Sequence, residues 1–214
     1  SLTALFFTLS RGAYLGLIMG IIFLTVLLFL RNTTKFLHGV ITKLIFLACA
    51  ALGLIVILNF PLTHSNFQKQ IVSLQSIQTR LEIWPATSRH IMKRPLLGYG
   101  PETFGITFPD FAPEGFSTNN AIPDRAHNEI LDIAFQVGIP GMLAYIGCIV
   151  ILFGVSLKKK FKTYEDWLMQ LGLLSSIVVL FVSNQFGFSV TVHWVYFILF
   201  IALLSRRALT NSPY

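Results

Sequence analysis

One histidine in the sequence has neighbours that suit it to proton transfer. His127 lies where a long polar segment gives way to an apolar stretch, and Asp124 precedes it as a candidate helix N-cap. This spacing predicts that His127 lies in the first helical turn, where the helix dipole favours the neutral imidazole. A neutral imidazole can accept a proton from an attacking hydroxyl. His127 is therefore a candidate general base, although an interfacial histidine can also serve simply as a hydrogen-bonded helix end.

Two arginines are candidates for holding an anion. Arg11 is followed by Gly12 and Ala13, whose small side chains let a ligand or another backbone approach closely. Arg80 lies in the long polar segment, one helical turn before Trp84. A planar guanidinium binds phosphate oxygens bidentately, so two converging arginines can clamp a diphosphate. The alternative for Arg11 is a side chain that snorkels to a membrane interface.

Three other polar residues are candidate supporting residues for such a site. Glu82 and Arg89 flank Trp84 in the segment that contains Arg80, and Asn128 follows His127 directly. A charged side chain on an amphipathic helix commonly faces water or lipid headgroups instead, and that alternative stays open for Arg89.

The sequence predicts neither a metal ion nor a cofactor. No two histidines have the spacing of helical zinc ligands, and the acidic pair Asp110 and Glu114 has the composition of a solvated loop. The run from Gly98 to Gly100 lacks the third glycine and the lysine of a nucleotide-binding loop, so it predicts a turn. The two cysteines lie in apolar runs without a CxxC pattern, which indicates packing residues.

The composition indicates a membrane protein. Of the 214 residues, 54% are apolar and 12% are charged, whereas soluble domains contain about 25% charged residues. The mean hydropathy is +0.71. A helix that crosses a bilayer needs about 20 apolar residues. Five stretches approach or exceed this length: 13–30, 42–58, 130–157, 167–186 and 190–204. We therefore predict an all-α, polytopic membrane helical bundle with about five transmembrane helices.

The positions of the basic residues predict the orientation. They follow the first, third and fifth stretches, and short loops rich in lysine and arginine lie in the cytoplasm; the residues are Arg31, Lys35, Lys43, Lys158, Lys159, Lys160, Lys162, Arg206 and Arg207. Most of the net charge of +7 is then explained by membrane anchoring, and no nucleic-acid partner is expected. The predicted domains are 1–58, with two transmembrane helices and a truncated amino terminus, a periplasmic loop at 59–126, and 127–214, with three transmembrane helices and a cytoplasmic tail.

The long loop carries helical patterns of its own. A capping box at Ser65 and Gln68 starts a predicted amphipathic helix. Its apolar face is predicted from Phe67, Ile71, Leu74, Leu81 and Trp84. Pro85 is predicted to open a second short helix that ends before Pro95. An irregular lid is expected at 96–123, and Gly138, Pro140 and Gly141 predict a bend in the following transmembrane helix.

Taken in order, several short motifs resemble the O-antigen ligase and O-antigen polymerase superfamily of membrane glycosyltransferases. The resemblance covers about 10–157, as the carboxy-terminal portion of such a protein. The motifs are Ser10-Arg11-Gly12, Arg80-Leu81-Glu82-Ile83-Trp84, the run 94–104, Ala126-His127-Asn128-Glu129-Ile130-Leu131 and Gly138-Ile139-Pro140-Gly141.

The resemblance implies an enzyme of the bacterial inner membrane with a periplasmic active face. It implies transfer of a glycan from an undecaprenyl-diphosphate-linked donor to a lipid or glycan acceptor, without a metal ion or a nucleotide sugar. By similarity, Arg11 and Arg80 correspond to arginines that hold the diphosphate, and His127 corresponds to the histidine that activates the acceptor hydroxyl.

Two other classes of protein are alternatives to this enzyme. A transporter of small anions would use basic residues near helix ends, but such proteins place their substrate sites near mid-membrane, where these stretches carry almost no charge. A structural scaffold predicts that Arg11, Arg80 and His127 lie far apart.

Overall fold

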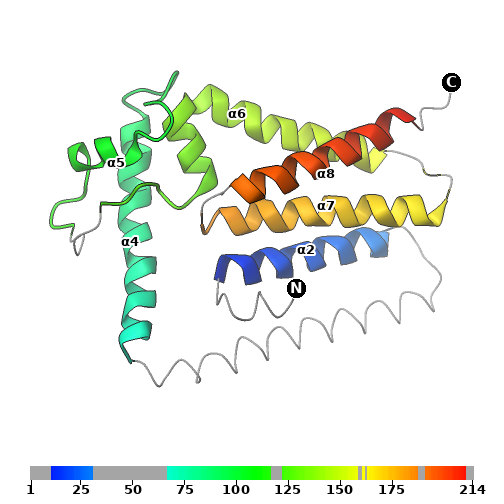
Figure 1. Ribbon diagram of the computed structural model, residues 1–214, viewed down its shortest axis with the longest axis horizontal. Coiled ribbons are helices and arrows are strands. Elements are labelled where there is room, and N and C mark those ends of the chain that lie inside the picture. Colours follow the sequence, from blue (N-terminus) through cyan, green and yellow to red (C-terminus); the bar gives the residue numbers. More distant parts are fainter. Residues whose placement is uncertain are drawn as a thin grey trace. The chain divides into compact units, whose positions relative to one another are not determined.

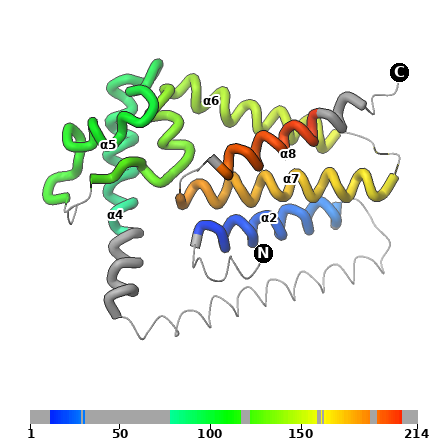
Figure 2. The backbone as a smooth tube through the Cα atoms, in the orientation of Figure 1, coloured from blue at the N-terminus to red at the C-terminus, as the bar shows by residue number. Residues whose placement is uncertain are grey.

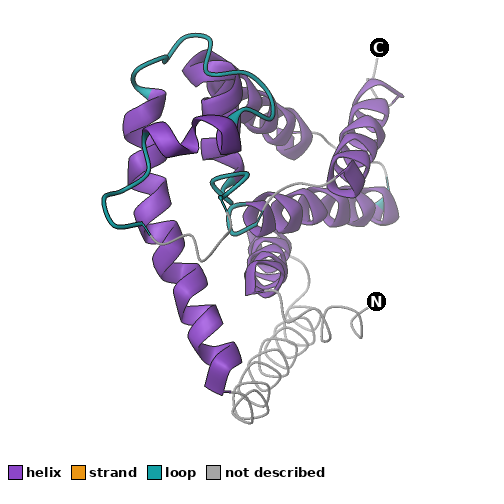
Figure 3. Cartoon of the chain, turned by 60° about the vertical axis from the view of Figure 1, so that its left-hand side comes forward, coloured by secondary structure: helices purple, strands orange, loops and turns teal. Residues whose placement is uncertain are grey.

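The structure, a computed structural model, is helical throughout the residues that it describes, which are 11–30, 67–116, 122–158, 161, 163–187 and 191–210. Figure 3 shows helices and connecting loops over this part of the chain. The all-α prediction is thus confirmed for the described residues. The elements are α2 (Arg11–Leu30), α4 (Phe67–Ile91), α5 (Phe104–Thr107), the 3-10 helix η2 (Phe108–Asp110), α6 (Glu129–Lys158), α7 (Tyr164–Asn184) and α8 (Thr191–Thr210).

The described elements fall into two compact units. Figure 2 traces the backbone of the chain by residue number. The first contains α2, the end of α6 from Ile151, α7 and α8. The second contains α4, α5, η2, α6 up to Val150 and a short segment that begins at Asn184. The predicted boundaries 1–58, 59–126 and 127–214 stay predictions.

Helix α7 is the centre of the first unit, and α2 and α8 lie alongside it in Figure 1. Its start is fixed by Thr163, whose hydroxyl oxygen accepts the Asp166 backbone N–H at 3.1 Å and whose hydroxyl donates to the Asp166 carboxylate at 2.8 Å. This arrangement caps an otherwise unsatisfied helix start. Further along, Leu174 and Ile177 are fully buried in one cluster with Leu204 of α8.

Helix α2 approaches α7 through glycines spaced four residues apart. A β-carbon on Gly16 would lie 2.5 Å from the carbonyl oxygen of Val179, and one on Gly20 would collide with the Val179 side chain. Small residues at this spacing let two membrane helices approach until their backbones touch. The α2–α7 contact therefore depends on the absence of a side chain at these positions.

We expect Gly16→Ala to weaken the packing of α2 on α7. The new methyl group meets a backbone oxygen, so the helices must move apart, at a cost of about 1–3 kcal/mol. Thermal unfolding of the full chain in detergent measures this loss. Gly172→Ala on α7 is the matched control, because a β-carbon there meets nothing within 4 Å. An equal or smaller loss for Gly16→Ala than for Gly172→Ala would contradict the role of this contact.

Two of the described helices, Glu129–Lys158 and Tyr164–Asn184, are long and apolar enough to cross a membrane. They correspond to the predicted stretches 130–157 and 167–186. Shorter apolar stretches lie at Gly12–Leu28 and Val192–Ser205, and the predicted stretch 42–58 lies outside the described residues. The total of about five spans and the periplasmic side of the loop stay predictions.

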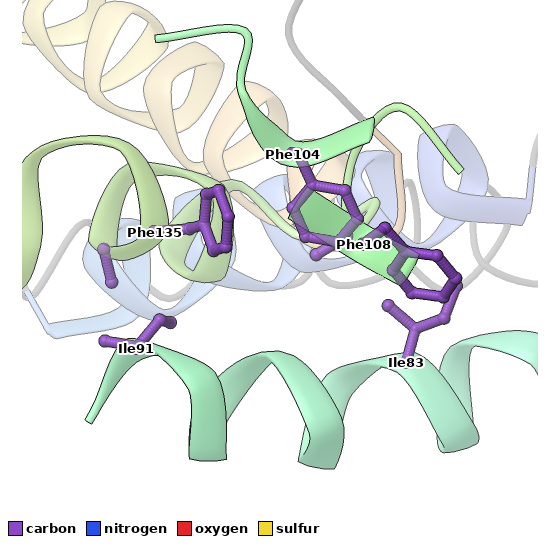
Figure 4. Close-up of a cluster of buried hydrophobic side chains, with 7 residues drawn as sticks. Ile83, Ile91, Phe104, Phe108 and Phe135 are labelled. Carbon is purple, nitrogen blue, oxygen red and sulfur yellow. The ribbon is translucent and has the colours of Figure 1, made fainter. Parts of the chain in front are cut away.

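An aromatic core holds the second unit together (Figure 4). Ile83 and Ile91 of α4 pack against Phe104 and Phe108 of the short helices and against Phe135 of α6. Each of these side chains is at most 5% exposed, so the segment predicted as an irregular lid contains two short helices seated on a packed core. Residues 117–121 of that segment lie outside the described residues.

Helix α4 differs from its prediction in two respects. It continues through Pro85, where a second helix was expected to start, and it ends at Ile91 before Pro95 as predicted. The buried face is Ile83, Ala86, Thr87, His90 and Ile91, whereas Leu81 is 64% exposed. Of the predicted apolar face, Trp84 packs against the aromatic core and Leu81 does not, so the residues buried in this core are a different set from the apolar face read from the sequence. The capping box at Ser65 and the side chains of 67–77 lie outside the described residues.

His90 belongs to this core as an aromatic ring. It stacks between Tyr99, at 4.5 Å between ring centroids, and Phe111, at 4.2 Å. Burial lowers the pKa of His90, and the nearby Lys93 lowers it further. The imidazole is therefore kept in the neutral form that such an aromatic stack requires.

The predicted bend in α6 is confirmed, and a neighbouring loop completes it. Gly138 has φ 78° and ψ 176°, a conformation open only to glycine. Pro140 has no N–H to offer the Gln136 carbonyl, so that oxygen accepts the Gly100 N–H at 3.0 Å. The Phe135 carbonyl likewise accepts the Tyr99 N–H at 2.8 Å, and the Ile139 N–H donates to the Pro95 carbonyl at 2.7 Å. The loop at 95–100 thus satisfies the backbone groups that the bend releases.

Candidate active site

His127 lies just before α6 and not in its first turn. The helix begins at Glu129, and Asn128 is its N-cap: the Asn128 side-chain oxygen accepts the Leu131 N–H at 3.1 Å. The prediction that Asp124 caps a helix containing His127 is therefore wrong. The side chain of Asn128 is held in the capping position by a second bond, because its amide donates to the Gln185 carbonyl at 3.2 Å. The supporting residue Asn128 thus lies beside His127 as a structural cap.

The backbone of His127 is in the left-handed region, with φ 56°. Residues other than glycine adopt this conformation at a cost of about 1–3 kcal/mol and keep it only where their surroundings enforce it. Ala126, directly before it, is fully buried, and its carbonyl accepts the indole N–H of Trp84 at 2.9 Å. The Ala126 N–H donates to the Asp132 carboxylate at 2.7 Å. The chain around His127 is held on both sides, and its half-buried imidazole is presented from a fixed loop.

The environment of His127 keeps its imidazole neutral. Burial is the largest cause that lowers its pKa below the usual 6.5, and the positive charge of Arg80 is the second. Asp124 opposes these effects, while Arg125 adds to them. The helix dipole invoked in the sequence analysis is therefore not needed, because desolvation and a neighbouring guanidinium have the same result. The neutral imidazole of His127 can act as a base, and the neighbouring guanidinium of Arg80 can bind an anion.

Arg80 is the sequence-predicted arginine that the structure associates with His127. It is half-buried on α4, the helix that also supplies Trp84 to the loop holding His127. Its charge influences the imidazole even though 47 positions separate the two residues in the chain. Local sequence spacing could not bring these residues together; the packing of α4 against the start of α6 does.

The other two supporting candidates point elsewhere. Arg89 follows Arg80 by nine residues, which places it on the opposite face of α4 and about 14 Å along the axis. Its side chain is exposed. Glu82 accepts a hydrogen bond from Gln78 at 3.4 Å on the exposed side of the helix. The charges that mainly shift the pKa of His127 are those of Arg80, Asp124 and Arg125, and not those of Glu82 or Arg89.

Arg11 is the first residue of α2 and lies in the other compact unit. Its side chain is outside the described part of the structure. Its convergence with Arg80 and His127 therefore stays a prediction.

Sequence reasoning did not predict the contacts that hold the chain around His127. Trp84 and Asp132 hold Ala126, as described above, and Arg125 forms an ion pair with Glu102 at 2.9 Å. Glu102 is itself at positive φ, 56°. The local signals for the first two contacts are a tryptophan within a polar segment and an acidic residue within an apolar stretch. The ion pair joins residues 23 positions apart and has no local signal.

Among the described residues, no group of three or more histidine, cysteine or acidic side chains could hold a metal ion. Asp110 and Glu114 are exposed, as expected for solvated carboxylates. Cys148 is a free, exposed cysteine of α6. The positive charge near His127 comes from arginine side chains.

The comparison with protein families gives one match. The profile of the family described as O-antigen ligase matches residues 1–146, which include Arg11, Arg80, His127 and the Gly138 bend. The chain belongs to the O-antigen ligase family. This family comprises membrane-integral enzymes of the ligase and polymerase type that act on lipid-linked glycans. No curated protein and no solved structure matches the chain significantly.

Proposed function

We propose that the protein transfers a glycan from an undecaprenyl-diphosphate-linked donor to an acceptor hydroxyl at the outer face of the bacterial inner membrane. His127 is the general base, and Arg80, together with Arg11, binds the diphosphate. The acceptor is a lipid or another glycan. The observation that carries the proposal is the neutral imidazole of His127, on a backbone held by its neighbours and within electrostatic reach of Arg80, in a chain of the O-antigen ligase family.

The proposed chemistry needs one proton acceptor and positive charge. The acceptor oxygen attacks the anomeric carbon of the donor while His127 takes the proton of the attacking hydroxyl. The bond between the anomeric carbon and the phosphate oxygen breaks, and the undecaprenyl diphosphate leaves with the bonding electron pair. Arginine side chains stabilise the charge that develops on this leaving group.

The surroundings of His127 support its role as the base. The pKa of His127 lies below 6.5, so the imidazole is ready to accept a proton at neutral pH. Its backbone, at φ 56°, is held by the hydrogen bonds to Ala126, which favours a fixed starting point for the side chain, and general-base catalysis depends on such positioning. Family membership favours glycan transfer over the alternative of small-anion transport.

The direct test uses the full-length protein in detergent or vesicles. It is incubated with a synthetic undecaprenyl-diphosphate glycan and an acceptor, and the product is measured by mass spectrometry. We expect product formation that EDTA does not reduce, because guanidinium groups supply the positive charge. A donor with a monophosphate linker should react far more slowly. The absence of transfer from every diphosphate donor, or equal rates with both linkers, would overturn the proposal.

The charge of Arg80 should set the acid limit of the reaction. The rate is expected to fall as the pH decreases through the pKa of His127, because the protonated ring cannot act as a base. Arg80→Gln removes a charge that lowers this pKa, so the acid limb of the pH–rate profile should move to higher pH, toward 6.5. The profile of kcat/KM against pH measures the shift, because it reports the pKa of His127 in the enzyme without bound donor. Arg89→Gln is the matched control on the same helix and should leave the acid limb in place.

If the acid limb of Arg80→Gln coincides with that of the unsubstituted protein, Arg80 and His127 do not share a site. A shift of the acid limb to lower pH would also contradict the prediction. Removing a neighbouring positive charge stabilises the protonated imidazole, so it can only raise the pKa of His127.

A further inference from the structure

The strongest unassigned feature near the proposed site is the carboxyl group of Asp132. It lies in the first turn of α6, five residues after His127, and is only 6% exposed. One oxygen, Oδ1, accepts the backbone N–H of Ala126 at 2.7 Å. The backbone N–H of Asp132 donates to the carbonyl of Asn128 at 2.8 Å. A single residue therefore bonds to the residues on both sides of His127.

These bonds act where the chain is strained. His127 has φ 56°, a backbone conformation that costs free energy for a residue other than glycine. Trp84 holds the peptide group that joins Ala126 to His127, and Asp132 holds the far side of Ala126. The direction of the His127 side chain follows from this backbone conformation, so a loss of the Asp132 bond releases the ring.

The carboxyl group is costly for the fold by itself. Its second oxygen, Oδ2, is buried without a hydrogen-bond partner among the described residues. A buried polar atom without a partner destabilises a protein, and a buried acid is weak evidence for a stabilising role. Burial of Asp132 therefore costs stability, and its hydrogen bond to the Ala126 N–H is better explained by the position that this bond gives to the neighbouring His127.

We infer that Asp132 is a positioning residue for His127, holding the base in the orientation needed for proton transfer. This inference rests on the proposed function. Its acceptor atom Oδ1, and not its charge, is the functional feature. Asp132→Asn retains a carbonyl oxygen at that place, whereas Asp132→Ala removes it.

The two variants separate the acceptor from the charge. We expect Asp132→Ala to lower kcat about 100-fold, the size of effect that follows from misplacing a reacting group by about 1 Å, with KM for the donor nearly unchanged. Asp132→Asn should retain kcat within about threefold, since its side-chain oxygen replaces Oδ1. Equal losses in both variants, or a loss in KM alone, would overturn the inference.

A second measurement isolates the action through His127. In a His127→Gly background, imidazole added to the buffer replaces the missing ring and is not held by the loop. We therefore expect Asp132→Ala to leave the imidazole-rescued rate unchanged, whereas a role in general folding would lower it. A further loss in the rescued rate would contradict the positioning role.

The controls distinguish this inference from the function on which it rests. Asp166→Ala removes a carboxylate from the first turn of another helix and should not change the kcat-to-KM pattern. If replacing His127 leaves transfer intact, the proposed function itself fails. If replacing His127 stops transfer but Asp132→Ala does not slow it, only the positioning inference fails. Should Asp132→Ala prove unstable, Asp132→Asn decides by itself, because a large loss of its kcat excludes Oδ1 as the functional atom.

Discussion

Replacing His127 by Asn should reduce glycan transfer by about 100- to 10,000-fold, the usual contribution of a general base. Asparagine is the informative substitution because it tolerates the left-handed backbone that His127 adopts, φ 56°, and cannot accept the proton. The thermal unfolding midpoint should therefore stay close to that of the unsubstituted protein. Initial rates of product formation at saturating donor measure the effect on kcat.

Two companion variants make this result interpretable. His127→Gly should be inactive alone and partly restored by imidazole in the buffer, because the missing group is a base and not a packing element. His193→Asn removes an imidazole from the first turn of α8 and should retain transfer. An active His127→Asn protein would show that another group takes the proton.

Gly138→Ala should destabilise the fold by at least about 2 kcal/mol, through a backbone conformation that only glycine adopts and a clash with a neighbouring chain. Gly138 has φ 78° and ψ 176°, and a β-carbon there would collide with the Leu96 carbonyl oxygen. The loop at 95–100 would have to leave α6, which breaks its three backbone hydrogen bonds to Phe135, Gln136 and Ile139. Thermal unfolding in detergent, with proteolysis of the released loop, measures the loss.

Two controls separate the contributions to this effect. Gly115→Ala places an alanine at a positive φ, 73°, with nothing within 4 Å of the new methyl group, so it reports the cost of a positive φ without a clash. Gly147→Ala on α6 adds a methyl group in open space and should be neutral or stabilising. If Gly138→Ala costs no more than Gly115→Ala, the contact between the loop and the bend is not tight.

Local patterns predicted much of the backbone. Apolar length marked α6 and α7 as candidate spans, and the glycine and proline at 138 and 140 marked the bend in α6. The turn at 98–100 was predicted from the same local chemistry, and Gly98 and Gly100 indeed have positive φ. These features depend on steric limits within a few residues, which the sequence states directly.

Where two local signals were equally good, contacts with residues distant in the sequence decided between them. Both Asp124 and Asn128 are good cap residues, and Asn128 became the cap because its side chain also bonds to Gln185, 57 positions away. Pro85 was compatible with a new helix start, but α4 continues through it while its neighbours Ile83 and Ala86 pack into the aromatic core. The same core left Leu81 exposed.

The sequence alone determined which residue types are available for chemistry: an imidazole, arginines and a bend flanked by glycine. Only the tertiary structure brought Arg80 within electrostatic reach of His127 and placed Trp84 and Asp132 on the backbone of Ala126. The physical reason is that side-chain periodicity reports contacts within one helix, whereas these partners meet because α4 and α6 share a buried core. That core fixed the strained conformation of His127, which no local pattern encodes.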